Sequence, residues 1–230
     1  MDRIYSGGIV QCAFCAVGGA AKFRGTHIWD TVLAETKNFI VVPSKGALIE
    51  GWILVVPRQH FLSLGALPLE MKEELRGLVK DMSSMLSQRY CPPTFFEHGP
   101  SKPTTAFGCG VDHAHLHLVP LVTKISEAAT VQMGAPEIMD EQDFWEQWPI
   151  AIRHQGGSDY LMLGEPSRPV YVWESPTTVS QFFRRLIAAS IGLPQMYDYR
   201  QFPFEDNVCK TILTLRGELL DDLKTHAVAG

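Results

Sequence analysis

Three histidines alternate with apolar residues near the middle of the 230-residue chain, in the segment His113-Ala-His-Leu-His-Leu-Val119. Because a strand places every second side chain on one face, this spacing predicts that His113, His115 and His117 share one face of a strand. Three imidazoles are costly in a core and unusual on a solvent face. The pattern therefore indicates a functional cluster.

Two kinds of chemistry fit such a cluster. Neutral imidazole is a common metal ligand, so the rings could hold a catalytic metal. Alternatively, His115 could attack phosphorus, with its other ring nitrogen held by a backbone carbonyl and neighbouring groups supplying a donor. Gly108 and Gly110 precede the cluster and permit a tight turn that presents backbone N–H groups to a phosphoryl oxygen. This favours a phosphate ligand over a bare metal.

The segment resembles the signature of the histidine-triad (HIT) family, in which three histidines alternate with apolar residues. The similarity extends to Trp52-Ile-Leu-Val-Val-Pro-Arg-Gln-His60, which resembles the family's strand-Pro-x-x-His segment, and to Cys12-Ala-Phe-Cys15. It covers about half of the chain. The resemblance implies an α+β fold on a five-stranded antiparallel sheet that binds nucleotides and is often dimeric, so we expect a homodimer.

The resemblance also implies a reaction. The middle histidine, His115, would attack the α-phosphate of a nucleotide and form a nucleotidyl-histidine intermediate, with His117 and backbone amides stabilising the phosphoryl oxygens. We expect a nucleotide hydrolase that cleaves a P–N or P–O bond at a nucleoside 5′-phosphoryl group. A nucleotidyltransferase or phosphorylase with the same intermediate stays an alternative, as does a non-catalytic nucleotide-binding module.

The substrate-binding segment departs from the family pattern. Phosphoramidase and dinucleoside-polyphosphate hydrolase members commonly have Gly-Gln-Ser/Thr-Val before the triad, whereas this chain has Gly108, Cys109, Gly110 and Val111. Phosphate binding would therefore rely on backbone N–H groups and on His117. The third triad residue is histidine rather than the glutamine typical of the nucleotidyltransferases, which favours hydrolysis.

A CxxC pair, Cys12 and Cys15, can be redox-active, metal-binding or incidental. No thioredoxin-like βαβ context is visible, and a structural zinc ion needs four nitrogen or sulfur ligands. In the zinc-containing branch of the family, the other two are the histidine of the Pro-x-x-His segment and the first triad histidine. The resemblance thus implies structural zinc on Cys12, Cys15, His60 and His113, and no organic cofactor.

Hydrophobic periodicity predicts the elements that must position these residues. Apolar and β-branched runs predict strands at residues 38–42, 52–56, 94–97, 113–121, 160–163 and 170–173. Helical spacing predicts helices at residues 68–88, 141–148, 180–191 and from about 205 to 223. With no βαβ alternation and no Gly-rich phosphate loop, the fold class is α+β. We expect a HIT-like catalytic domain over residues 1–122 and an α/β extension packed on it over residues 123–230.

Charge is divided unevenly between these two parts. The formal net charge is −5, made of +1 (11 Lys/Arg, 10 Asp/Glu) over residues 1–122 and −6 (9 against 15) over residues 123–230. Neither part is a basic nucleic-acid surface by bulk charge. No apolar run is long enough for a membrane span, five cysteines cannot all pair within one chain, and no signal-peptide pattern is present, so we expect a cytoplasmic protein.

The acidic part still offers candidates for ligand contact. Its stretch from Ser180 to Phe204 resembles the C-terminal extension of larger HIT-like hydrolases and, faintly, splicing-associated HIT-like proteins. Arg184 and Arg185 could bind phosphate, since guanidinium suits bidentate contacts. Alternatively, they pair with acidic residues on the surface. In the first part, His98 lies where such proteins often carry a polar residue near the phosphates.

Overall fold

The computed structural model describes residues 12–18, 27–103, 111–147, 158–174 and 179–228; for Gly18, Gln147 and residues 217–228 it describes the backbone only. Within these residues, eight strands form one antiparallel sheet in the order β1-β2-β3-β5-β4-β7-β8-β6. Their bounds are β1 Ala34–Glu35, β2 Phe39–Pro43, β3 Ile53–Pro57, β4 Thr94–Gly99, β5 Leu116–Val119, β6 Glu137–Met139, β7 Tyr160–Gly164 and β8 Val170–Glu174.

The α+β class is confirmed, but the expectation of a five-stranded sheet is wrong for the whole chain. Residues 34–119 contribute five strands, and the second part adds β6, β7 and β8 to the same sheet. A five-stranded sheet would leave β4 as an edge with unpaired backbone groups. Instead β7 pairs with β4 from Phe95↔Gly164 to Gly99↔Tyr160. The second part therefore continues the sheet.

The strand predicted at residues 113–121 is shorter in the structure, where β5 covers Leu116–Val119. His113 and His115 precede it because the groups that would extend the ladder bond elsewhere. The Ala114 N–H donates to the Phe61 carbonyl (2.7 Å), and the Pro57 carbonyl accepts from the ring Nε2 of His113 (2.8 Å). The three histidines thus do not share one regular strand.

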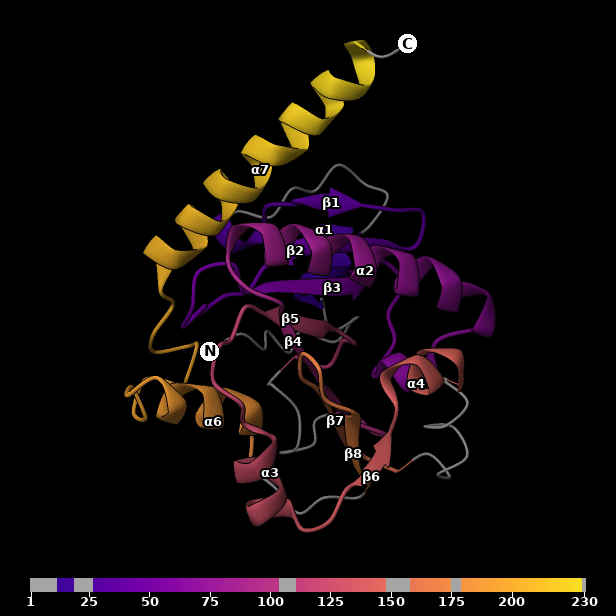
Figure 1. Ribbon diagram of the computed structural model, residues 1–230, viewed down its shortest axis with the longest axis vertical. Coiled ribbons are helices and arrows are strands. Elements are labelled where there is room, and N and C mark those ends of the chain that lie inside the picture. Colours follow the sequence, from indigo (N-terminus) through magenta and orange to yellow (C-terminus); the bar gives the residue numbers. More distant parts are fainter. Residues whose placement is uncertain (1–11, 19–26, 104–110, 148–157, 175–178, 229–230) are drawn as a thin grey trace, which may run out of the picture.

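Helices cover the sheet and connect its strands (Figure 1). They are α1 Ala13–Gly18, α2 Lys72–Arg89, α3 Ser126–Met133, α4 Glu141–Gln147, α6 Phe182–Ser190 and α7 Glu205–Val228, with 3₁₀ turns η1 Ile28–Asp30, η2 Leu64–Ala66 and η3 Leu69–Met71. The C-terminal part of α7, yellow in Figure 1, extends away from the sheet.

The predicted apolar stripe of α2 is buried at five positions: Leu75, Leu78, Val79, Met82 and Leu86. The helix begins later than the sequence predicts because its first turn is the separate 3₁₀ turn η3. Among the described helices, none is long and apolar enough to cross a membrane.

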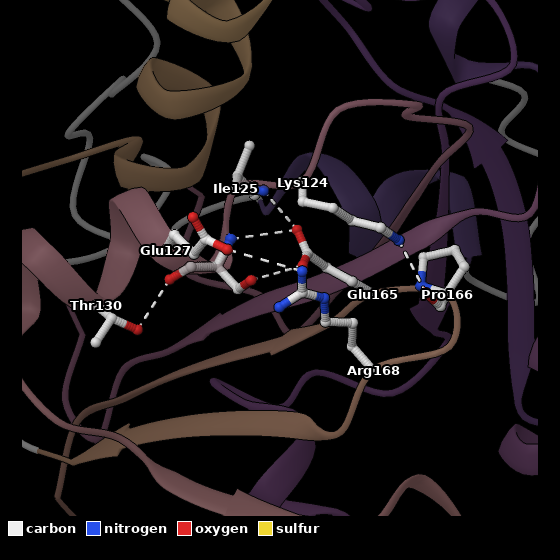
Figure 2. A network of polar contacts seen from close by, with 8 residues as sticks. Lys124, Ile125, Glu127, Thr130, Glu165, Pro166 and Arg168 are labelled. Carbon is white, nitrogen blue, oxygen red and sulfur yellow. Dashed lines mark hydrogen bonds and ion pairs between the residues drawn. The ribbon is translucent and has the colours of Figure 1, made fainter.

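The turn between β7 and β8 is joined to α3 by a buried carboxylate (Figure 2). Glu165 accepts hydrogen bonds from the backbone N–H of Ile125 (2.5 Å) and of Ser126 (3.2 Å) and from the Ser126 hydroxyl (2.7 Å). Lys124 Nζ donates to the Pro166 carbonyl (2.8 Å). A negative charge at a helix N-terminus satisfies its N–H groups and favours the helix dipole, so Glu165 anchors α3 to the hairpin.

Candidate functional site

Four side chains from three distant segments form a candidate metal cluster. Cys12 directly precedes α1 and Cys15 lies in its first turn, His60 is in the loop after β3, and His113 is in the segment before β5. Their four potential ligand atoms lie within 4.8 Å of one another. Within the described part of the chain, no other group of three or more His, Cys, Asp or Glu residues is arranged to hold a metal ion.

The donor atoms of this cluster have spacings that suit a tetrahedral zinc ion. Nδ1 of His113 lies 3.3 Å from Sγ of Cys12 and 3.5 Å from Sγ of Cys15, and Nδ1 of His60 lies 3.4 Å from Sγ of Cys15. Tetrahedral bonds of ordinary zinc–sulfur and zinc–nitrogen length separate ligand atoms by roughly 3.3–3.8 Å. The donor set fits zinc in its chemistry, and these three separations fit the tetrahedral geometry.

The pKa values of His113 and Cys15 indicate which protons these two residues carry before a cation binds. The Nε2–H of His113 donates to the Pro57 carbonyl, which directs the Nδ1 lone pair toward the two sulfurs. Burial lowers the pKa of His113 to about 4, so its ring is neutral at pH 7. Burial, and then the neighbouring Cys12, raise the pKa of the Cys15 thiol to about 11, so without a cation this thiol keeps its proton at pH 7, and a bound cation would displace that proton.

His115 is held as the tautomer that a nucleophile requires. Its Nδ1 lies 2.7 Å from the backbone carbonyl of His113, which can only accept, so Nδ1 carries the proton and Nε2 keeps its lone pair. Burial lowers the pKa of His115, so the ring is neutral at pH 7. Phe14 of α1 packs beside it, with ring centroids 5.5 Å apart.

His117 lies 4.8 Å from His115, measured between ring centroids, and is oriented by aromatic side chains. The indole Nε1–H of Trp52 donates to its Nδ1 (3.0 Å), and Phe96 stacks on its ring at 4.3 Å and 14°. Burial, and then the charges of His115, His98 and Arg184, hold the pKa of His117 well below its usual range. The neutral ring therefore carries its proton on Nε2.

A pocket that is open to solvent lies beside His115 and His117. Its remaining lining is mainly apolar and aromatic, with one lysine, one arginine and one aspartate: Phe14, Val17, Trp29, Asp30, Val42, Pro43, Ser44, Lys45, Leu54, Val111, Arg184 and Tyr199. A nucleotide needs such a combination of apolar surface for its base and a few polar groups for its phosphate. Both parts of the chain contribute to the wall.

Arg184 of α6 reaches this cavity from the second part of the chain. It is 1% exposed, its Nε–H donates to the Tyr197 carbonyl (3.0 Å), and its Nη2 donates to the Gly46 carbonyl. Gly46 has a φ of +69°, and a Cβ added there would lie 2.4 Å from the Cβ of Tyr199. Glycine is therefore required where the β2–β3 turn meets the extension.

Arg185 and His98 lie outside the cavity lining. The guanidinium of Arg185 stacks 3.6 Å from the ring centroid of Tyr197, and its Nε–H donates to the Ser180 carbonyl. His98 is buried in β4 between Phe96 and Phe183, where burial, and then His115 and Arg184, lower its pKa to about 3. His98 therefore lies near the triad without lining the cavity, and Arg185 contacts only residues of the extension among its described partners.

The predicted phosphate-binding residues Gly108, Cys109 and Gly110 lie outside the described residues, so their role stays a prediction. Sequence reasoning missed two contributors to the site. Trp52 was predicted only as a strand residue, although its position two residues before Leu54 places it on the same face of β3. Lys45, whose Nζ lies 4.6 Å from the Trp29 ring, carried no signal of its own because a lysine in a turn is common.

Comparisons with solved structures find histidine-triad proteins, as the motifs predict, but over only part of the chain. No protein-family model matches the chain, and no curated protein matches its sequence.

Solved structures that resemble the chain include a zinc-bound histidine-triad family protein from Mycobacterium smegmatis, at 22% identity and a TM-score of 0.38 over 48% of this chain and 74% of the other. A hypothetical histidine-triad nucleotide-binding protein from Sulfolobus tokodaii has 20% identity and a TM-score of 0.38 over 62% and 90%. A HIT-like protein from Bartonella henselae has 16% identity and a TM-score of 0.34 over 42% and 76%.

Likeness at this level carries no inference about substrate or reaction, which depend on the residues of this chain. In its motifs, and in structure over part of its length, the chain is similar to histidine-triad proteins.

Proposed function

We propose that the protein is a nucleotide hydrolase that cleaves a P–N or P–O bond at a nucleoside 5′-phosphoryl group through a covalent intermediate on His115. The observation that carries this proposal is the 2.7 Å contact between Nδ1 of His115 and the His113 carbonyl. It leaves a neutral ring with its lone pair on Nε2, beside a pocket lined mainly by apolar and aromatic side chains. A second imidazole, His117, borders the same cavity with its proton on Nε2.

In the first step, Nε2 of His115 attacks the α-phosphorus, and the bond from phosphorus to the leaving group breaks, with the electron pair departing on the leaving group. An amine leaving group takes up one proton from solvent as it departs, and the second step returns one. Because Nδ1 keeps its proton, the nucleotidyl-imidazole is positively charged and is itself a good leaving group. In the second step, water attacks phosphorus, the P–N bond to His115 breaks, and one proton of the water is released. The products are a nucleoside monophosphate and the original neutral ring.

His117 assists by hydrogen bonding rather than by proton transfer. Its Nε2–H can donate to a phosphoryl oxygen as negative charge develops, while Trp52 occupies its Nδ1. Arg184, already held by the Tyr197 and Gly46 carbonyls, adds a fixed positive charge to the same wall. We further propose that the predicted backbone amides of residues 108–110 complete the phosphate contacts.

We also propose a zinc ion on Cys12, Cys15, His60 and His113. When bound, it would neutralise the thiolates and join α1 to the catalytic segment. Four protein ligands leave it no open position, as in structural sites. Because Phe14 of α1 packs on His115, this link would also hold one wall of the cavity in place.

The domain division at residues 122 and 123, a homodimer and a cytoplasmic location stay predictions. The pairing of β4 with β7 supports close packing of the two parts, since each of its hydrogen bonds joins a residue of the first part to a residue of the second.

Turnover of three nucleotide conjugates tests the proposal. The protein is incubated with adenosine phosphoramidate, a dinucleoside polyphosphate or a nucleotide sugar, with and without inorganic phosphate, and products are separated by chromatography. Release of a nucleoside monophosphate, lost in His115→Asn, is the expected result. Phosphate-dependent release of a nucleoside diphosphate would identify a phosphorylase instead. Nucleotide binding with no turnover of any conjugate would identify a binding module.

A further inference from the structure

The indole of Trp52 lies fully buried against the third histidine of the triad. Its Nε1–H donates to Nδ1 of His117 at 3.0 Å, and the two rings meet edge to face at 69°. An indole N–H can only donate, so Nδ1 of His117 must be the acceptor. This contact excludes the Nδ1–H tautomer and also the doubly protonated ring, which has no acceptor nitrogen.

Strand register brings the two rings together. His117 pairs with Leu54 across β3 and β5, and Trp52 precedes Leu54 by two residues. Trp52 and His117 are therefore diagonal neighbours on one face of the sheet, a separation that a large aromatic side chain can bridge. The Trp52 carbonyl also accepts from the Ser44 N–H (2.9 Å), which continues the β2–β3 pairing and holds the tryptophan backbone in place.

Two further side chains restrict these rings. Phe96, which pairs with His117 across β4 and β5, stacks on the imidazole and fixes its plane. The guanidinium of Arg184 lies 4.6 Å from the centroid of the Trp52 ring. Since Arg184 belongs to α6, the second part of the chain reaches the triad through this tryptophan.

The neighbouring histidines consequently carry opposite tautomers. At His115 a carbonyl oxygen faces Nδ1 and leaves a lone pair on Nε2. At His117 an N–H faces Nδ1 and leaves a proton on Nε2. One ring is prepared to attack and the other to donate, although the two residues are identical in type and lie two positions apart.

We propose that Trp52 is a positioning residue that selects the Nε2–H tautomer of His117 and so directs a hydrogen-bond donor at the phosphoryl group. The catalytic consequence rests on the proposed function, whereas the tautomer is a property of this chain alone.

The test is ¹⁵N NMR of the protein labelled in its histidine rings, with the His117 signals assigned by their absence in His117→Gln. In the wild-type protein, Nδ1 of His117 is expected to resonate as an unprotonated nitrogen and Nε2 as a protonated one. In Trp52→Phe, which keeps an aromatic ring but lacks the N–H, we expect a mixture of both tautomers. A wild-type Nδ1–H signal would overturn the proposal, whatever the variants do.

Trp173→Phe is the matched control, because Trp173 is also buried and donates its indole N–H to a carbonyl, that of Gly134 (2.9 Å). It should leave the His117 signals unchanged. Nucleotidylation of His115, followed by intact mass, should slow about tenfold in Trp52→Phe, which corresponds to one buried hydrogen bond, and not in the control. An unchanged tautomer or an unchanged rate in folded Trp52→Phe would contradict the positioning role. Absence of nucleotidylation in the wild type would refute the proposed function instead, while the NMR result would still decide the tautomer.

Discussion

His113 and His115 are two residues apart, yet they belong to regions that are built in different ways. His113 joins a cluster assembled from α1 and a loop, in which His60 is exposed and both cysteines are half-buried. His115 and His117 are buried, and the groups that orient them are a backbone carbonyl and an indole. The first region can be completed by a metal ion, whereas the second is already preorganised by the fold. The difference shows that identical residues at regular spacing receive different roles from the atoms that meet their Nδ1.

The largest expected effect is the loss of turnover in a variant of the second region, compared with the loss of metal in a variant of the first. His115→Asn should lower turnover by at least about 10³-fold, because the proposed nucleophile is lost, while metal content and thermal stability stay as in the wild type. His113→Asn should lose the metal and the stability that depends on it. Steady-state kinetics, elemental analysis and thermal unfolding of both variants provide the measurement. A loss of zinc in His115→Asn would show that the two regions are not separate.

Metal removal should affect the first region by a comparable free energy. Where free zinc stands 1,000-fold above its Kd, binding stabilises the fold by about 4 kcal/mol, so Cys15→Ser or chelation should lower the free energy of unfolding by up to that amount. Denaturant unfolding with and without zinc measures it. Cys91→Ser is the control, since Cys91 is a half-buried cysteine outside the cluster. Equal loss in both variants would argue against a metal cluster.

A smaller effect is expected where the extension closes the cavity of the second region. Gly46→Ala should cost about 2–4 kcal/mol, because alanine is strained at positive φ and its Cβ would meet Tyr199. Gly192 has a φ of +78° but open space around a Cβ, so Gly192→Ala should cost only about 1 kcal/mol. Thermal unfolding of both variants separates the cost of the contact with Tyr199, which only Gly46→Ala incurs, from the cost of backbone strain, which both incur. Similar costs would mean that the extension does not press on this turn.

The smallest effect is a pH dependence that belongs to neither histidine region. Glu97 accepts from the Leu64 N–H (2.7 Å) and meets the Tyr160 hydroxyl, and burial raises its pKa to about 8. Because the folded-state pKa of Glu97 is raised, burying this residue costs no stability below about pH 4.5, where the carboxyl is neutral in both states. The free energy of unfolding then falls as the pH rises toward 8. Glu97 alone should contribute a loss of about 2 kcal/mol between pH 5.5 and 7.5, whereas the buried histidines, whose pKa values are lowered, contribute a gain over the same range.

Glu97→Gln, which resembles the neutral acid, should remove the Glu97 contribution, so that the stability of the variant rises more steeply with pH than that of the wild type. Denaturant unfolding across that pH range measures the slope in both proteins. Equal slopes in the two proteins would show that Glu97 does not titrate in this range and that the pH dependence belongs to other groups, the histidines of the two regions among them.

Much of this organisation could be predicted from local pattern. The apolar runs of β2 and β3, the stripe of α2 and the CxxC with its two distant histidines all have a short-range or motif signal. The pairing of β7 with β4 had no such signal, because an apolar run can predict a strand but not the strand with which it pairs. β5 begins later than predicted because His113 and Ala114 form hydrogen bonds with the Pro57 and Phe61 carbonyls. The tautomer of His117 depends on the hydrogen bond from Trp52. Both features arise only when distant segments of the chain meet.

The division of labour among the three histidines is tested most directly by locating the covalent intermediate. The protein, in excess over adenosine phosphoramidate, is quenched within milliseconds in alkali, digested and analysed by peptide mass spectrometry. We predict adenylyl groups on His115 and none on His113 or His117. An adduct on either of those two residues, or turnover with no adduct on any histidine, would contradict the account.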